Sequence, residues 1–266
     1  MFRILLRPAR SEGAIRSCTV ALSRSRTAFA AFLCSLLFAL PAFATLDVPA
    51  GTVSSTGGGA FDLACSDLLV AGTLNLDGGQ IINVRHVNIQ PGGVVNGNTG
   101  LISLYGNWSN GGSFTAGNST INFADNAACT TGSAVSGNTT FRTVNFISAI
   151  GKTYTFAAGS TQYVTGVLSI SGTSALPINF VSSVPGQLAY IDLSGVQLIG
   201  GVAVDWVGAA GQWLAPGATN RNANGVAPRW FGQGEPVPIL NGALLVLLTL
   251  FMLLAGARLR RKPRVT

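Results

Sequence analysis

Between Leu68 and about Trp206, short runs of alternating apolar and polar residues are separated by Gly, Asn and Ser. This alternation, in runs rich in Val, Ile, Thr and Phe, predicts β-strands with one buried face. The clearest runs are residues 73–76, 82–85, 86–89, 120–123, 153–156, 177–180 and 191–193. No stretch of residues 45–234 shows the 3.6-residue periodicity of an amphipathic helix, so the pattern predicts an all-β domain.

Glycine-containing turns recur with a period of about twenty residues. Units in which a turn leads into a strand begin at Ala71, Gly92 and Gly111, 21 and then 19 residues apart. We expect their glycines to supply the positive φ angles that tight turns need. A period near twenty is typical of one coil of a parallel β-helix, in which each coil packs on the next. We therefore predict a single-stranded, right-handed parallel β-helix, or solenoid, with a β-sandwich as the alternative.

The two ends of this domain are predicted to be caps. Residues 45–67 precede the regular repeats and include Phe61 and Cys65, so we expect them to cover the first coil. Beyond Val207 the alternation becomes irregular. Three of the four tryptophans lie in or beside this final stretch: Trp206, Trp213 and Trp230. Because a solenoid needs terminal capping, we expect these rings to seal its end rather than to bind a ligand.

The chain continues into a long uncharged apolar run, ILNGALLVLLTLFMLLAGA, at residues 239–257. As a helix, these nineteen residues would span about 28 Å, close to the thickness of the hydrocarbon core of a bilayer. Five cations follow directly: Arg258, Arg260, Arg261, Lys262 and Arg264. We therefore predict a transmembrane helix with a cytoplasmic basic tail, which places the preceding domain outside the cytoplasm.

The first 44 residues have the order of a secretory signal peptide. Six arginines precede an apolar stretch at residues 28–40, and the sequence Pro-Ala-Phe-Ala follows it. The small side chains of Ala42 and Ala44 match the pattern of a signal peptidase site. Cleavage is therefore predicted between Ala44 and Thr45.

These patterns divide the chain into five parts. They are a signal peptide (1–44), an exported β-solenoid domain (45–234), a linker with a sorting motif (235–238), a transmembrane helix (239–257) and a basic cytoplasmic tail (258–266). The exported part has about 190 residues, which is enough for one sizeable core, and we interpret it as a single domain.

The net charge of +7 belongs to the terminal segments rather than to the exported domain. Residues 45–234 contain five Lys or Arg against seven Asp and no Glu, a net charge of −2. Nucleic-acid binding needs a clustered basic face that neutralises phosphates. The sequence of this domain provides no such cluster, so the charge pattern argues against that class of partner.

Cysteine usage fits an exported domain. Cys18 and Cys34 belong to the predicted signal peptide, which leaves Cys65 and Cys129 in the mature chain. Two cysteines in an oxidising compartment admit one intrachain disulfide, which we predict, with two buried free thiols as the alternative. Closing this 64-residue loop contributes about 4 kcal/mol in the chain-entropy description.

The carboxylates of the exported domain are the candidate catalytic groups of a carbohydrate-cleaving β-helix. They are Asp47, Asp62, Asp67, Asp77, Asp125, Asp192 and Asp205. Glycoside hydrolysis usually needs two carboxylates about 5–10 Å apart, and no two of these acids are spaced by the repeat on one clear face. Asp62 and Asp67, the closest pair, flank Cys65 in the predicted N-terminal cap, while Asp77 and Asp125 have turn-like neighbours. We therefore predict no enzymatic activity and no catalytic residues.

His86 is the only histidine. It lies between Arg85 and Val87 in an alternating run, with no Cys or carboxylate at the spacing of metal ligands. We expect a strand residue that faces solvent, and we predict neither a metal site nor a cofactor.

The C-terminal region resembles the tripartite sorting signals of Gram-negative bacteria. Its motif residues are Val237, Pro238, Ile239 and Leu240, followed by the apolar run and the basic tail. This arrangement is similar to the Ile-Pro-Thr-Leu type, a relative of the PEP type, which exosortase-family membrane enzymes process. Ile239 stands where that motif has Thr, and the Trp-Gly that commonly follows is absent. The middle of the chain resembles the Gly/Asn/Thr-rich β-solenoid regions of bacterial surface proteins and adhesins.

These resemblances imply export, retention at the inner membrane facing the periplasm, and processing that releases the domain to the cell surface or extracellular matrix. The implied partners are the membrane, signal peptidase, an exosortase-family enzyme and exopolysaccharide. The expected function is that of a non-enzymatic structural or adhesive envelope protein, often associated with biofilm. A carbohydrate-binding or carbohydrate-cleaving β-helix is the alternative.

Overall fold

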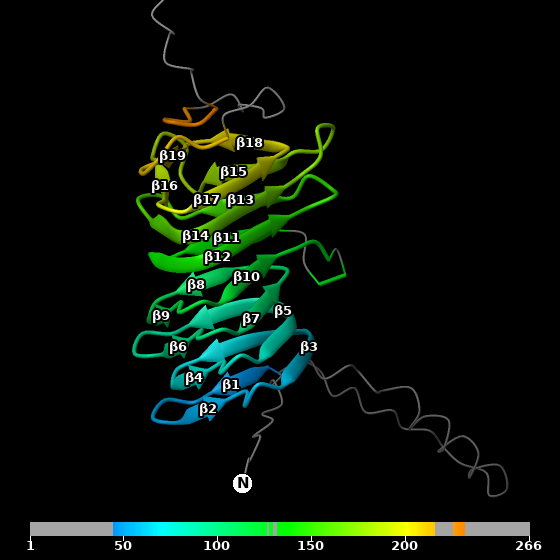
Figure 1. Ribbon diagram of the computed structural model, residues 1–266, viewed down its shortest axis with the longest axis vertical. Helices are drawn as coiled ribbons and strands as arrows, with labels where there is room; N and C mark the ends of the chain where they lie inside the picture. The colour runs from blue at the N-terminus through cyan, green and yellow to red at the C-terminus, as the bar shows by residue number, and fades with distance from the viewer. Residues whose placement is uncertain (1–44, 127, 130–131, 216–225, 232–266) are drawn as a thin grey trace, which may run out of the picture. The chain divides into compact units, whose positions relative to one another are not determined.

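The computed structural model describes residues 45–126, 128–129, 132–215 and 226–231. These residues form nineteen β-strands and no helix. Every described strand pair is parallel, and each strand lies beside one that is about one coil away in the sequence. The chain therefore winds as a parallel β-solenoid of about seven turns (Figure 1). The β-sandwich alternative is wrong, because the sheets of a sandwich are antiparallel.

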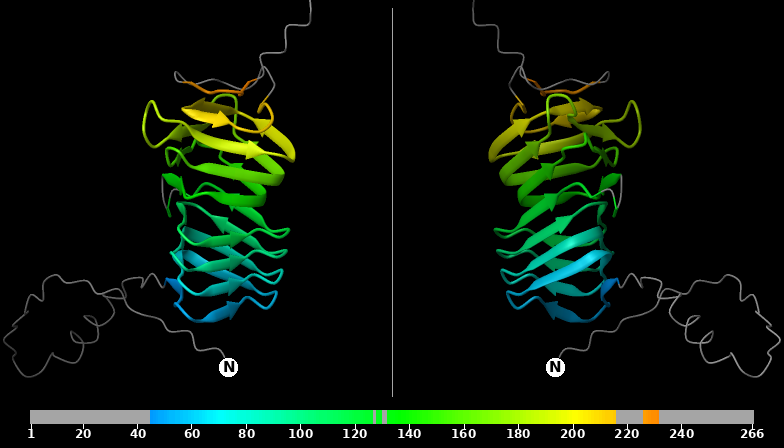
Figure 2. Two further views of the ribbon diagram at one scale, coloured as in Figure 1. Left: turned by 90° about the vertical axis from the view of Figure 1, so that its left-hand side faces the viewer. Right: turned by 90° about the vertical axis from the view of Figure 1, so that its right-hand side faces the viewer.

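The strand pairings divide the solenoid into three faces, and Figure 2 shows its stacked coils from two sides. Face 1 contains β1 (Leu46–Val48), the ends of β3 (Ala60–Val70) and β5 (Gln80–Ile89), β8 (Trp108–Asn110), β11 (Ser133–Ser136), β13 (Thr153–Phe156), β15 (Ile178–Ser182) and β18 (Val202–Asp205). Face 2 contains β2 (Val53–Ser55), β4 (Thr73–Asn75), β6 (Val94–Asn96), β9 (Ser113–Thr115), the starts of β12 (Thr139–Ile147) and β14 (Thr161–Ser171), β16 (Ala189–Leu193) and β19 (Val207–Ala209). Face 3 contains the starts of β3 and β5, then β7 (Leu101–Leu104), β10 (Thr120–Phe123), the ends of β12 and β14, and β17 (Val196–Gly200).

The chain visits faces 1, 2 and 3 in turn. The first coil is β1, β2 and the start of β3, the fourth is β8, β9 and β10, and the seventh is β15, β16 and β17. The predicted repeat is confirmed at face 2, where Thr73 pairs with Val94 and Val94 pairs with Ser113.

The glycine before each of these face 2 strands is needed for close stacking of the coils. A Cβ built on Gly93 would collide with the carbonyl oxygen of Val70, and one on Gly112 would collide with the carbonyl oxygen of Gly93. Neither residue has a positive φ angle, whereas Gly92 does, at 86°. The prediction that glycine supplies positive φ in these turns is therefore right for Gly92 and wrong for Gly93 and Gly112.

Side chains alternate between the core and the surface, and the composition of the core changes along the axis. In the first three coils the buried hydrophobic side chains are aliphatic: Val48, Leu68, Val70, Leu74, Leu76, Ile81, Val84, Val87, Ile89, Val95, Ile102 and Leu104. From the fourth coil onward, aromatic rings form a connected network. Phe146 lies 4.8 Å from Phe123 and 4.9 Å from Phe180 between ring centroids, and Phe180 lies 6.2 Å from Trp230.

The two ends differ from the predicted caps. Residues 45–67 do not cover the first coil but form it, because β1 and the start of β3 pair directly with the next coil. At the other end, Trp230 is buried against Phe180 and forms a bridge with Leu214, as expected of a cap. Trp213, in contrast, is 44% exposed.

Among the described residues, no helix is long and apolar enough to cross a bilayer. The signal peptide with Ala42 and Ala44, the sorting motif, the apolar run 239–257 and the basic tail lie outside the described residues. Thr45 is described and exposed, and it stands directly before β1.

Candidate functional site

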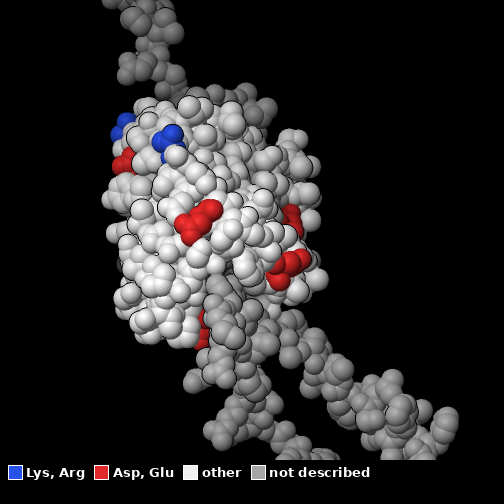
Figure 3. Space-filling model, turned by 60° about the horizontal axis from the view of Figure 1, so that its bottom comes forward, with Lys and Arg blue, Asp and Glu red and all other residues white. Residues whose placement is uncertain are grey.

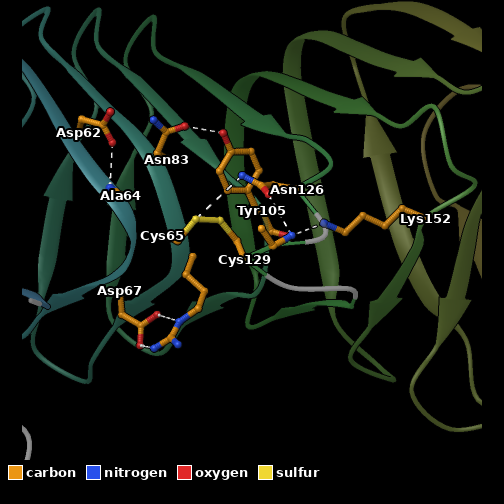
Figure 4. The surroundings of a disulfide bond; sticks show 11 residues. Asp62, Ala64, Cys65, Asp67, Asn83, Tyr105, Asn126, Cys129 and Lys152 are labelled. Atoms are coloured by element: carbon orange, nitrogen blue, oxygen red, sulfur yellow. Dashed lines mark hydrogen bonds and ion pairs between the residues drawn. A yellow bond between two sulfur atoms is a disulfide. The ribbon is translucent and has the colours of Figure 1, made fainter. Parts of the chain in front are cut away.

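Four ionisable side chains, those of Asp62, Asp67, Arg85 and His86, belong to the stretches of β3 and β5 where face 3 turns into face 1, and Figure 4 shows this region. At this corner the backbone takes left-handed conformations at Ala64, Cys65 and Asn83, with φ angles of 45°, 65° and 56°. The register between β3 and β5 shifts between Asp62 and Ser66. Such irregularities bend a strand and re-aim its side chains. We call this region the disulfide corner.

The structure contains the predicted disulfide between Cys65 and Cys129, whose Cα atoms are 5.4 Å apart. Cys65 belongs to β3, between the first and second coils, whereas Cys129 follows β10 of the fourth coil. The bond therefore ties a segment after the fourth coil to the beginning of the solenoid. The amide of Asn126 also approaches the sulfur of Cys65, at 4.0 Å.

Asp67 and Arg85 form a bidentate ion pair beside the disulfide. Arg85 Nε donates to Asp67 Oδ1 and its second terminal nitrogen donates to Asp67 Oδ2, both at 2.8 Å. Burial opposes ionisation of Asp67, but the hydrogen bond and positive charge of Arg85 outweigh it and hold the pKa of the carboxyl below its ordinary value. Both side chains are about one third exposed, so the pair links adjacent coils with little net stabilisation.

His86 is half-buried rather than facing solvent as predicted. Its Nδ1 accepts a hydrogen bond from the backbone N–H of Asn107 at 2.9 Å, so the proton of the neutral ring lies on Nε2. Burial, together with the positive charges of Arg85 and Lys152, lowers the pKa of His86 against the opposing effect of Asp67. This histidine therefore joins two coils through a backbone contact.

Lys152 is a buried cation that sequence reasoning missed. Its side chain reaches across to donate to the backbone carbonyls of Tyr105 and Ala124, the latter at 2.9 Å. The residue is 4% exposed, and burial lowers the pKa of its amine to about 8 against the opposing charge of Asp125. Its nitrogen also lies 5.4 Å from the centroid of the Tyr154 ring. The amine satisfies carbonyls that follow the ends of β7 and β10.

The described acids do not come together. Asp62 accepts from the backbone N–H of Ala64 at 2.8 Å, and this hydrogen bond lowers its pKa. Asp77 stands in a turn, as expected, and accepts from Ser55 and Asn98 at 2.6 and 2.9 Å. Figure 3 shows acidic and basic side chains scattered over a largely uncharged surface.

Asp125 accepts from the backbone N–H of Ala149 at 2.8 Å. In the part of the chain that the structure describes, no three His, Cys, Asp or Glu side chains are close enough to share a metal ion.

Hydrogen bonds at this corner connect one coil to the next. The hydroxyl of Tyr105 donates to Asn83 Oδ1, and Ser133 Oγ donates to the carbonyl of Tyr105 at 3.2 Å. On face 2, Asn96 likewise donates to Asn75 at 2.8 Å. At the disulfide corner, the coils are therefore cross-linked by one disulfide, one ion pair and several hydrogen bonds to the backbone.

No family model, no curated protein and no solved structure matches this chain. The fold assignment therefore depends on the parallel registers themselves.

Proposed function

We propose that this chain is a non-enzymatic structural or adhesive protein of the bacterial cell envelope or extracellular matrix. The signal peptide carries the domain across the inner membrane, and signal peptidase leaves Thr45 as the mature N-terminus. The helix at residues 239–257 then holds the domain at the membrane, facing the periplasm. The exported part is a right-handed β-solenoid that acts as a rigid body.

The observation that best supports this proposal is the Cys65–Cys129 disulfide. Structural disulfides persist in oxidising compartments outside the cytoplasm and are rare inside it. A domain that depends on one is suited to the periplasm or the cell exterior. The charges around the bond support a structural role, because Asp67 and Arg85 bind each other and Lys152 binds backbone carbonyls.

The sorting motif supports the second part of the proposal, namely processing. An exosortase-family enzyme cleaves at the motif formed by Val237, Pro238, Ile239 and Leu240 and releases the domain to the surface or matrix. There it associates with exopolysaccharide.

A reporter fusion tests the topology. Alkaline phosphatase, which requires an oxidising compartment, is fused after Gly234, and green fluorescent protein is fused after Thr266 as the matched control. We expect an active phosphatase and a fluorescent C-terminal fusion. An inactive phosphatase with a fluorescent protein at the same position, after Gly234, would place the solenoid in the cytoplasm and refute the proposal.

Mass spectrometry of the mature termini tests the processing. We expect an N-terminus at Thr45 and, in material released to the surface, a C-terminus within the sorting motif. The variant Pro238→Ala should keep the C-terminus intact. Released wild-type protein that still contains Arg260 would contradict cleavage at the motif.

A panel of glycans separates the structural role from the enzymatic alternative. We expect the full-length protein to release no reducing ends from any of them. Release that Asp67→Asn or Asp62→Asn abolishes would overturn the structural reading and favour a carbohydrate-cleaving β-helix.

A further inference from the structure

The outward side of face 3 changes character along the solenoid axis. Two columns of outward residues follow from the registers: Leu101, Thr120, Thr143, Val167 and Val196, and beside them Ser103, Asn122, Asn145, Ser169 and Leu198. In the fourth and fifth coils, the outward pairs are Thr with Asn, and Asn145 donates to Asn122 at 2.7 Å. In the seventh coil both positions are aliphatic, and Val196 and Leu198 are 61% and 62% exposed.

A segment with a further exposed apolar side chain, Trp213, lies next to β17. The side chain of Gln197, which lies between Val196 and Leu198, donates to the carbonyl of Trp213 at 2.9 Å and accepts from the N–H of Ala215 at 2.8 Å. These bonds hold the segment of Trp213 beside β17, and the tryptophan is 44% exposed. We call Val196, Leu198 and Trp213 the last-coil patch.

The patch stands out among the described residues. Among the described residues before Ile147, Val53 is the one large hydrophobic side chain that is exposed, so such side chains concentrate in the later coils. No charged residue occurs in β17, in the end of β14 that pairs with it (Val167–Ser171), or in residues 212–215. Exposed apolar patches of this kind mark interaction surfaces, and a tryptophan beside aliphatic side chains suits a membrane interface.

The sequence that follows the described residues indicates which partner binds the last-coil patch. Phe231 is separated by seven residues, 232–238, from the apolar run that begins at Ile239. A fully extended segment of that length reaches about 24 Å. The bilayer is therefore the partner whose chemistry and availability fit an uncharged apolar patch in the last coil.

We propose that the last-coil patch inserts into the interfacial region of the bilayer, so that the solenoid rests on the membrane by its seventh coil. This inference depends on the proposed function, because the C-terminal helix must anchor the domain. The aliphatic side chains enter the boundary between headgroups and acyl chains, and the indole of Trp213 lies at headgroup level. The polar outward residues of the fourth and fifth coils stay in water.

Spin labelling of the full-length protein in vesicles of phosphatidylethanolamine and phosphatidylglycerol tests the proposal. The background carries Cys18→Ser and Cys34→Ser, while Cys65 and Cys129 remain in their disulfide. A nitroxide is attached at Leu198→Cys, and the matched control is Asn122→Cys, in the same column three coils earlier. Val196→Cys with Thr120→Cys provides a second pair if one variant fails to fold.

We expect the collision rate of the label with oxygen, relative to that with a water-soluble nickel chelate, to be about threefold or more higher at Leu198→Cys than at Asn122→Cys. If the two positions give equal collision ratios in membrane-anchored protein, this inference is overturned, but the proposed function is not. Dipolar broadening that grows with the protein-to-lipid ratio would show that the patch contacts a second copy of the chain instead of the bilayer. This result would also overturn the inference.

Carbonate extraction of the same vesicles distinguishes failure of the membrane anchor from failure of the patch insertion. Protein that stays in the membrane pellet retains the anchor of the proposed function, and the label ratio then decides the inference. Protein released by carbonate would refute both the anchor and the inference that depends on it.

Discussion

The first three coils and the last three solve the same packing problem in different ways. Face 2 partners in the early coils are 20 and 21 residues apart, as in Val53–Thr73 and Thr73–Val94, and the core there is aliphatic. In the late coils the corresponding pair Thr161–Tyr190 is 29 residues apart, and the core is a network of rings. The fourth coil joins the two, with regular spacing and Trp108 as its first buried ring.

The difference shows that two kinds of interaction keep the coils of this solenoid in register. In the early coils, tight glycine turns keep the coils at nearly the same length. Aliphatic side chains fill the interior of these coils. In the late coils, loops of variable length have no such constraint, and large rings that contact several coils hold the register instead. The two halves should therefore respond differently to substitution.

The largest effect is expected from removing a ring at the centre of the network. Phe180 contacts Phe146, Tyr154, Phe156 and Trp230. Phe180→Ala should lower the free energy of unfolding by about 4 kcal/mol, through lost burial and a cavity. Chemical denaturation of the full-length protein in mild detergent measures this change.

A double-mutant cycle sharpens the result. Combined with Phe146→Ala, whose ring lies 4.9 Å away, the changes should be non-additive by about 1 kcal/mol or more. The control cycle uses Leu74→Ala and Ile121→Ala, which lie on different faces two coils apart, and should be additive within about 0.5 kcal/mol. Equal coupling in both cycles would contradict the proposed contrast.

Removing the disulfide should weaken the early coils selectively. The variant Cys65→Ser/Cys129→Ser loses a closed loop with a sequence separation of 64, worth about 3–4 kcal/mol. Because coils of a solenoid contact only their neighbours, amide hydrogen exchange should accelerate most in residues 60–123 and little in residues 178–205. Uniform acceleration along the chain would argue against independent halves.

The paired glycines of one early turn provide a matched comparison. Gly92→Ala meets no neighbouring atom and should cost about 1 kcal/mol for its left-handed φ of 86°. Gly93→Ala forces a methyl group against the carbonyl of Val70 and should cost about 2 kcal/mol more. Thermal unfolding of the two variants measures the difference, and equal melting temperatures would refute the stacking argument.

The smallest effect concerns pH. Burial lowers the pKa of Lys152 to about 8, below its value in the unfolded chain, so the unfolded state binds more protons between pH 8 and 10. The free energy of unfolding should therefore rise across this window, by about 1–2 kcal/mol, and Lys152→Met should remove the rise. Above pH 10 the trend reverses, because burial raises the pKa of Tyr154 and the unfolded chain ionises first.

Much of the early solenoid is predictable because its signals are local. The alternation of residues 73–76 and 120–123 and the spacing of the Gly-initiated turns predict strands and coil length directly. The pairing of Cys65 with Cys129 follows from the predicted removal of the other two cysteines, Cys18 and Cys34, with a signal peptide. Residues 45–67 were misassigned to a cap because their strands β1 and β2 have three residues each, too few for a periodicity to register.

The site could be predicted only in part, because its decisive contacts are long-range. Lys152 binds carbonyls 28 and 47 residues earlier in the chain, and backbone acceptors carry no sequence signal. His86 is similar, since its partner is the backbone N–H of Asn107 one coil later. The one available sequence signal for the Lys152 contact was a lysine directly before the alternating run 153–156.

The staple at the disulfide corner has a mechanical consequence. If the chain is pulled by its two ends, tension passes from Cys65 to Cys129 through the sulfur bond and bypasses the residues between them. The stretch between these cysteines, whose sequence separation is 64, has a contour length of about 220 Å and does not bear the load. Stretching therefore unravels the strands before Cys65 and beyond Cys129, while the second, third and fourth coils remain wound and shielded from the load.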